Sequence, residues 1–355
     1  MKHYKSTNLH SRTGRKYSRI FGLPLATLAA VLLAGCQEVP AAIFLPVSPS
    51  ATAIHDLSLV LLAIAAVVLV VIEALLFIAI VRFRNRPESE VEQTHGNLPL
   101  EIGWTVATSL AVILVMVLTV KTMGEATATS TSVLPSTSAW PNDEMHLRAV
   151  GYQWWWYFEY PQLGIVTANE AHVPLEKPVK LQLEAADVIH SFWVPRLGGK
   201  LDMIPGTVNY SSFVAIQSGI YEGVCAEFCG VQHARMAFRV IVDPTARFSS
   251  WIREQQQPAT KPVTEEQKAG EQLFLQSCGG CHTVRGTQAS GKTGPDLTHV
   301  ASRLKIAAGT IDNTPEQMAR WLRDPQEIKP GNLMPASRLD AAAIDQLVAY
   351  LENLR

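Results

Sequence analysis

The sequence lacks an excess of charge of either sign. Its 355 residues carry 30 lysines and arginines against 31 aspartates and glutamates, a formal net charge of −1. Nucleic-acid-binding domains generally carry a basic excess, so this balance argues against nucleic acid as a partner. Charged residues make up only 17% of the chain and hydrophobic residues 48%, which favours a protein partly embedded in lipid. The length leaves room for two or three domains, each with its own core.

Cysteine is also scarce, and none of the five cysteines is left over for a structural disulfide. Cys36 closes an apolar N-terminal segment, and the other four form two close pairs, Cys225 with Cys229 and Cys278 with Cys281. Each cysteine therefore falls inside a distinct local pattern. The pairs are typical of metal ligands or of cofactor attachment points rather than of structural disulfides.

The N-terminus has the layout of a secretory signal. A polar, basic stretch precedes an apolar run over residues 20–34, which ends in Leu-Ala-Gly-Cys36. We expect residues 1–36 to be a signal segment. The ending resembles the lipobox of bacterial lipoproteins, in which the cysteine is lipidated and becomes the mature N-terminus. Lipidation is favoured here over an ordinary cleaved signal or a retained anchor helix.

Two long apolar stretches follow, over residues 57–81 and 102–123. At about 1.5 Å per residue each is long enough to cross a bilayer. The short connection between them begins Arg-Phe-Arg-Asn-Arg, and the positive-inside rule places that loop in the cytoplasm. We therefore expect a two-helix transmembrane hairpin over residues 54–124, with everything after it outside. Glu101 opens the second stretch, where a carboxylate is favourable at a helix N-terminus.

From about residue 145 the pattern changes to short, β-rich runs broken by glycine and proline. Polar and apolar residues alternate in the Val-Lys-Leu-Gln-Leu-Glu segment 179–184, as a half-buried strand requires. Strands of this length and spacing predict an antiparallel sandwich or small barrel, which we place at residues 140–245.

The chemistry of this domain lies in the segment 225–236, Cys-Ala-Glu-Phe-Cys-Gly-Val-Gln-His-Ala-Arg-Met. A single Cys–His–Met loop with an upstream histidine, here His190, is the ligand set of a mononuclear electron-transfer copper site. The second cysteine lets two thiolates bridge two coppers, each metal taking one imidazole and one weak ligand. The alternatives are a disulfide or a zinc site. A closed tetrahedral zinc site gives no reason for Met236 three residues after His233.

These positions resemble, in residue type and spacing, the dinuclear copper (CuA) site of cytochrome c oxidase subunit II. The resemblance covers roughly residues 54–243 and implies a cupredoxin-like Greek-key barrel. In this family the Glu227 position binds copper through its backbone carbonyl, and its side chain reaches a magnesium site at the boundary with subunit I. The implied copper ligands are His190, Cys225, Glu227, Cys229, His233 and Met236.

Two further positions take a role from the same resemblance. The aromatic segment Gly151–Tyr160 resembles the family's aromatic region, in which Trp154 would be the electron-entry residue. The alternative is that these aromatics pack the barrel, as Trp155 and Trp156 can do. Glu101 matches the family's carboxylate near the cytoplasmic mouth of one proton pathway, and helix capping is its alternative.

A polar stretch over residues 246–263 shows no apolar periodicity and predicts a linker. The Cys278-Gly-Gly-Cys281-His282 motif that follows is the attachment pattern of a c-type haem. A redox dithiol or half of a zinc site is the alternative, but no second cysteine pair follows. The surroundings resemble the cytochrome c family, so we expect an all-α cytochrome c domain over residues 264–355.

Within that domain the Gly-Pro-Asp-Leu segment 294–297 resembles the loop that supports the proximal histidine. Met334, in Gly-Asn-Leu-Met-Pro, would be the sixth iron ligand. Histidine–methionine ligation raises the haem potential. Met318 is the competing thioether, but its helical segment favours a place in the core. Residues 341–354 predict an amphipathic helix that packs on the first helix of the domain.

The fold class expected is thus a multidomain membrane protein with a helical hairpin, a β-barrel and a cytochrome. The resemblance implies that electrons pass from haem c to CuA and on to the haem–copper, oxygen-reducing centre of subunit I, coupled to proton translocation. It also implies subunit III as a neighbour, cytochrome c or a quinol–cytochrome c reductase as donor, and a bacterial inner membrane with the redox domains on its outer face. A copper-dependent nitric oxide reductase subunit and a membrane-anchored electron carrier without an enzyme partner remain as alternatives. A copper-delivery protein fits less well, because it needs an exchangeable site.

Overall fold

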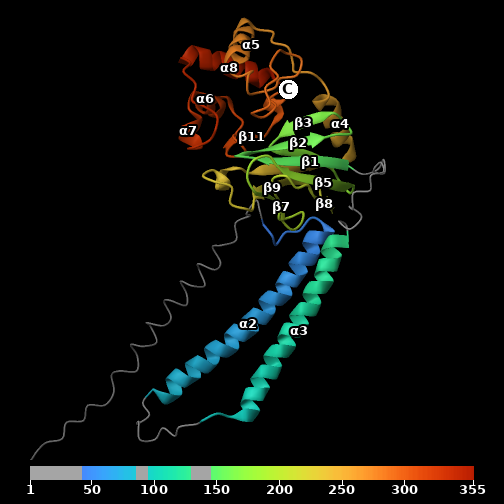
Figure 1. The fold of residues 1–355 in the computed structure, drawn as a ribbon, viewed down its shortest axis with the longest axis vertical. Coiled ribbons are helices and arrows are strands. Elements are labelled where there is room, and N and C mark those ends of the chain that lie inside the picture. The colour runs from blue at the N-terminus through green and yellow to red at the C-terminus, as the bar shows by residue number, and fades with distance from the viewer. Residues whose placement is uncertain (1–41, 85–94, 129–144) are drawn as a thin grey trace, which may run out of the picture. The chain divides into compact units, whose positions relative to one another are not determined.

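The computed structural model describes residues 42–84, 95–128 and 145–355 (Figure 1). The predicted signal with Cys36 lies outside the described residues, as does most of the loop that carries the arginines. The order of elements is a pair of long helices, a β domain and a helical C-terminal domain. This is the layout that the sequence predicts.

The two long helices are α2, Pro49–Phe83, and α3, Leu98–Ala128, which lie side by side (Figure 1). Both are long and apolar enough to cross a membrane. Helix α2 begins at Ser48, whose hydroxyl accepts a hydrogen bond from the Ala51 amide at 3.1 Å, and Pro49 fits the first helical turn. Both helices extend several residues beyond the apolar stretches, because capping and polar flanks also adopt helical geometry.

The beginning of α2 is tied to loops of the β domain. The Ser48 hydroxyl donates to the Leu197 carbonyl at 2.8 Å. The Val47 amide donates to the Arg196 carbonyl at 2.9 Å, and the Val47 carbonyl accepts from the Ile216 amide at 2.9 Å. These bonds satisfy backbone groups at a helix start that would otherwise lack partners. They also fix where the polypeptide enters the helix relative to the β domain.

The β domain is a sandwich of two five-stranded sheets. One sheet has the order β3-β2-β1-β5-β8 and the other the order β4-β10-β9-β6-β7. The sandwich is mostly antiparallel, as expected, but the neighbouring strands β1 and β5 run parallel, as do β4 and β10. The strands are β1 Met145–Tyr152, β2 Trp155–Tyr160, β3 Ile165–Ala168, β4 Glu170–Pro174, β5 Pro178–Ala185, β6 His190–Trp193, β7 Leu201–Met203, β8 Asn209–Val214, β9 Gly219–Cys225 and β10 Phe238–Asp243.

The core between the sheets is rich in aromatic residues. Alternate residues of β2 point inward, so Trp156, Phe158 and Tyr160 are each fully buried. The rings of Trp156 and Phe192 both pack against Phe238, each pair with centroids 4.6 Å apart. This cluster supports the segment that carries the candidate metal ligands, because the Trp156 indole donates to the Met236 carbonyl.

The segment after β10 differs from the prediction of a linker over residues 246–263. Helix α4, Thr245–Gln255, occupies its first part and buries Phe248 and Trp251 in the core of the β domain. The Trp251 ring stacks on His172 of β4 with centroids 4.6 Å apart. The β domain therefore extends to residue 255, and only the residues after α4 connect it to the next domain.

The C-terminal domain is helical, with α5, Glu265–Ser277, packed against α8, Ala341–Asn353 (Figure 1). A Cβ at Gly270 would lie 2.0 Å from the Gln346 carbonyl oxygen, so only glycine allows the helices to approach this closely. This packing confirms the predicted amphipathic helix. The smaller elements are the 3₁₀ helix η3 Val300–Ser302, the two-stranded β11 Lys305–Ile306 and β12 Ile311–Asp312, and helices α6 Pro315–Arg323 and α7 Pro325–Ile328.

Candidate metal and haem sites

We define the copper loop as residues Cys225–Met236, which follow β9 and include the 3₁₀ helix η2, His233–Arg235. The Sγ atoms of Cys225 and Cys229 lie 3.8 Å apart. The Cys225 Sγ is 3.8 Å from the His190 Nδ1, and the Cys229 Sγ is 3.6 Å from the His233 Nδ1. The Met236 Sδ lies 3.3 Å from the Cys229 Sγ. His190, Cys225 and Cys229 are buried, with their ligand atoms within 4.8 Å of one another, and His233 and Met236 adjoin this group through the Cys229 sulfur.

This donor set fits copper, which the residues of the cluster would hold. Each sulfur has one imidazole nitrogen next to it, and the two remaining donors are the Met236 thioether and the Glu227 carbonyl. Thiolate, thioether and imidazole are the ligands that copper prefers, and a burial that excludes water suits a site whose geometry must not change. Both cysteines and Met236 are buried.

His190 is oriented for metal binding by Asp187. The His190 Nε2 lies 2.8 Å from an Asp187 carboxylate oxygen, which can only accept. The proton therefore sits on Nε2, and the Nδ1 lone pair faces the sulfurs. Burial lowers the pKa of this imidazole, but the hydrogen bonds to Asp187 and Cys225 outweigh it, so the pKa is raised from its ordinary value.

The two thiols titrate as a pair. The hydrogen bond from Cys229 lowers the pKa of Cys225 well below its ordinary value, while the same contact raises the pKa of Cys229. Because thiolates are the metal-binding form, metal binding must release any proton that the two sulfurs hold.

Glu227 presents its backbone and its side chain in different directions. Its carbonyl oxygen lies 3.2 Å from the Cys225 Sγ, inside the donor cluster. Its carboxylate is 44% exposed and lies 3.7 Å from the Lys200 ammonium. The backbone is thus available to the copper cluster, and the side chain is available to a group outside it.

Trp154 lies directly on the copper loop. Its indole Nε1 donates to the Cys229 carbonyl at 3.0 Å, and the Gln153 amide donates to the same oxygen at 2.7 Å. Trp156 instead is part of the core, with its indole bonded to the Met236 carbonyl at 2.9 Å. The neighbouring Trp155 ring stacks on Tyr152 with centroids 4.6 Å apart. Trp154 and Trp156 are therefore both hydrogen-bonded to a candidate ligand residue, but Trp156 is fully buried whereas Trp154 is partly exposed.

His282 of the C-terminal domain has the tautomer that iron ligation requires. Its Nδ1 donates to the Pro295 carbonyl at 2.8 Å, which leaves Nε2 without a proton. Burial lowers the pKa of His282, so the ring is neutral at neutral pH. A Cβ at Gly294 would lie 2.6 Å from His282 Cε1, so glycine is needed beside the ring. The adjacent thiols of Cys278 and Cys281 complete a set that fits covalent haem.

The two candidate methionines have different surroundings. Met318 of α6 is 3% exposed and belongs to the core of the domain, as expected. Met334 is partly buried against that core. Its amide bonds to the Asn332 side chain at 2.8 Å, and its carbonyl accepts from Gln326 at 3.1 Å. The loop that carries Met334 is therefore fixed on both sides of the thioether.

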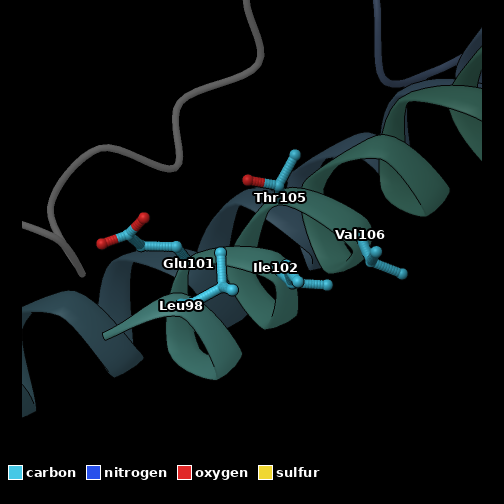
Figure 2. Close-up of a pocket in the computed structure, with 5 residues that line it drawn as sticks. All are labelled: Leu98, Glu101, Ile102, Thr105 and Val106. Atoms are coloured by element: carbon cyan, nitrogen blue, oxygen red, sulfur yellow. The ribbon is translucent and has the colours of Figure 1, made fainter. Parts of the chain in front are cut away.

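Glu101 lies in the first turn of α3 beside a shallow surface pocket lined by five residues, among them Ile102 and Val106 (Figure 2). Its carboxylate points the same way as the Thr105 side chain one turn later. It accepts from the Asn97 amide at 3.2 Å, while the Asn97 side chain accepts from the Leu100 amide at 3.2 Å. This reciprocal pair resembles a capping box, which supports the capping role and leaves the proton-pathway role a prediction.

Three residues that support the site belong to none of the motifs described above: Asp187, Gln153 and Lys329, whose ammonium donates to the Trp154 carbonyl at 3.1 Å. Asp187 stands three residues before His190, and a carboxylate that close to a ligand histidine is a usable signal. Gln153 is 76 residues from its partner Cys229 in the sequence, and Lys329 is 175 residues from Trp154. No local pattern indicates contacts over such separations.

Comparison with known families matches three segments of the chain. Residues 39–121 match the model of the cytochrome c oxidase subunit II transmembrane domain, and residues 164–243 match that of its periplasmic domain. Residues 267–355 match the cytochrome c family. The three segments coincide with the helical pair, the β domain and the C-terminal domain.

Individual relatives match nearly the whole chain. Cytochrome c oxidase subunit 2 of Alkalihalophilus pseudofirmus is 34% identical over 340 residues, which cover 94% of this chain and 96% of that protein. The subunit 2 of Bacillus subtilis is 34% identical over 346 residues, with 93% and 96% covered. Among solved structures, the periplasmic domain of subunit II of cytochrome oxidase from Bradyrhizobium japonicum is 32% identical, covers 33% of this chain and 96% of that chain, and has a TM-score of 0.32.

Proposed function

The chain belongs to the cytochrome c oxidase subunit II family and ends in a cytochrome c domain, and on that premise we propose that it is the electron-entry subunit of an oxygen-reducing complex. Electrons pass from the haem held at Cys278 and Cys281 to a dinuclear CuA centre in the copper loop. They continue to the haem–copper centre of subunit I, coupled to proton translocation. The single observation that carries this proposal is the convergence of two thiols, two imidazoles and a thioether around two buried sulfurs.

Different residues of the chain have different roles in the proposed electron transfer. When bound, the two coppers and the haem supply reversible one-electron chemistry. Asp187 and Pro295 hold His190 and His282 in the tautomers that bind metal. Burial of the cysteines keeps water away from the sulfurs. Trp154, bonded to the Cys229 carbonyl, is the electron-entry residue in this proposal, and Met334 is the sixth iron ligand.

The proposal extends to partners and place. Subunit I, and with it subunit III, takes the electron, and cytochrome c or a quinol–cytochrome c reductase supplies it. The copper and cytochrome domains lie on the outer face of a bacterial inner membrane, with Cys36 as the lipid anchor in this proposal. Glu101 lies at the opposite side, near the mouth of a proton pathway. The two apolar helices and the match to the family's transmembrane domain support this topology.

The decisive experiment is oxygen uptake by the complex purified from membranes, with copper and covalent haem counted per chain. We expect oxygen uptake, two coppers and one covalent haem in this subunit, and a copurifying polytopic haem protein. Nitric oxide reduction without oxygen uptake would instead assign the chain to a nitric oxide reductase. Purification without any haem subunit would leave only an anchored electron carrier.

Replacing Glu227 by glutamine separates its two proposed contributions. The carbonyl near Cys225 belongs to the backbone, so we expect Glu227→Gln to keep both coppers. A magnesium ion held by the carboxylate should bind about 10–100-fold more weakly. Metal analysis of the purified complex, with manganese as a spectroscopic substitute, measures both effects. Lys200→Met, which removes the ammonium 3.7 Å from the carboxylate, is the matched control. Loss of copper in Glu227→Gln would contradict the backbone assignment.

A further inference from the structure

Four residues that precede Met334, Ile328–Gly331, lie against the copper loop, and we call them the docking segment. Arg235 Nη1 donates to the Ile328 carbonyl at 2.6 Å, and the Gln232 amide donates to the Pro330 carbonyl. Between them the Lys329 ammonium donates to the Trp154 carbonyl at 3.1 Å. Three consecutive residues of the cytochrome domain are thus each hydrogen-bonded to the copper loop or to the tryptophan beside it.

Lys329 is an unusual residue for such a position. Its side chain is 3% exposed, and lysine is almost never fully buried unless it is paired. Its described hydrogen-bond partners are two carbonyl oxygens, those of Trp154 at 3.1 Å and Ala307 at 3.4 Å. Burial lowers the pKa of Lys329 to about 7. Burying an amine lowers the free energy of unfolding. Stabilisation of the fold therefore does not explain why Lys329 makes this contact.

A second contact between the cytochrome domain and the β domain lies away from the docking segment. The buried Glu170 carboxylate of β4 accepts from the backbone amides of Leu304 and Lys305, each at 3.0 Å. In the adjacent turn Ala308 is 3% exposed and packs into the core cluster of the β domain. A Cβ at Gly309 would lie 3.1 Å from Ala237, so this turn fits closely. Two separate contacts fix both the position and the rotation of the domain.

The contacts of Lys329 continue to a candidate copper ligand. The Trp154 carbonyl accepts from Lys329, and the indole of the same residue donates to the Cys229 carbonyl at 3.0 Å. A second route runs from Pro330 through Gln232 to the adjoining His233. Electronic coupling falls less steeply along covalent and hydrogen bonds than across van der Waals gaps. Both routes begin within six residues of Met334.

We propose that the docking segment is the surface through which the cytochrome domain transfers its electron to the copper loop. Lys329 is the positioning residue that holds this surface in one position against the copper loop. The inference rests on the proposed function, because it requires haem in one domain and copper in the other. It adds that the cytochrome domain works from one fixed docked position. The short connection after α4 therefore does not act as a tether for a freely swinging domain.

The test is the rate of electron transfer from haem to copper in the purified complex after flash photoreduction of the haem. In Lys329→Met, the haem and copper spectra and the haem potential should be unchanged. The transfer rate should fall by about tenfold or more, because a misplacement of about 1 Å can cost roughly 100-fold in rate. The rate should also become dependent on solvent viscosity, since the domain must then search for its docked position. Lys268→Met removes an exposed lysine whose hydrogen-bond partner among the described residues is Glu265 of the same helix, α5, and should behave as wild type.

A second variant keeps the test decisive if Lys329→Met does not retain its haem. Arg235 is largely exposed, so Arg235→Met should fold, lose the bond to Ile328 and slow the transfer severalfold. Wild-type rates without viscosity dependence in either intact variant would overturn the inference. A wild-type complex in which reduced haem never reduces copper would instead overturn the proposed function itself.

Discussion

Replacing Cys229 by serine should remove the dinuclear copper centre and lower oxygen uptake to below roughly one hundredth of wild type, because loss of even a supporting contact costs about 10–100-fold at such sites. Cys229 lies 3.8 Å from Cys225, 3.6 Å from the His233 Nδ1 and 3.3 Å from the Met236 thioether. Cys225 likewise lies near three donors, so the two cysteines connect the whole donor set. A serine oxygen is a hard, protonated group that cannot bridge two coppers.

Copper per chain and the electron paramagnetic resonance of the purified complex measure this loss. The covalent haem should remain, because its attachment residues lie in the other domain. Ala234→Ser is the matched control, since it adds a hydroxyl at an exposed position of the same loop without removing a donor. A Cys229→Ser complex with two coppers and wild-type oxygen uptake would show that the cluster is not the electron-entry centre.

Local sequence patterns predicted the order of the domains and the identity of the clustered donors. The spacing of Cys225, Cys229, His233 and Met236 is set within twelve residues, so one loop brings them together whatever the rest of the fold. His190 is more distant in sequence. It reaches the loop because β6 pairs with β9, with Phe192 opposite Cys225. Pairing of this kind depends on the whole sheet and is not visible in a local pattern.

Helix α4 is the clearest case of a signal that was present and overlooked. Phe248, Trp251 and Ile252 follow the spacing of an apolar helix face, and all three pack on the β domain. The polar residues around them hid this short pattern and suggested a linker. The contacts of the docking segment are different. Lys329 and Trp154 are 175 residues apart, and their contact depends on how two folded domains fit together.

Replacing both Cys278 and Cys281 by serine should abolish covalent haem and reduce oxygen uptake from a protein donor by roughly 100-fold. The electron then has to reach the copper centre without the haem that delivers it in the proposed route. The two thiols stand on either side of two glycines at the end of α5, next to His282. Serine hydroxyls do not add to the haem vinyl groups, so a single histidine–methionine pair would be left to hold the haem.

Copper should survive this substitution, and that contrast makes the experiment informative. The β domain has its own core, in which Trp156 and Phe238 lie beneath the copper loop, while Phe274 and Tyr350 belong to a separate core in the cytochrome domain. Haem remaining after denaturation is measured by peroxidase staining, and copper by elemental analysis. Ser277→Ala, which changes an exposed hydroxyl beside Cys278, is the matched control and should keep its haem. Loss of both metals together would mean that the copper loop depends on the docked cytochrome domain for its fold, and undiminished oxygen uptake would remove the haem from the electron path.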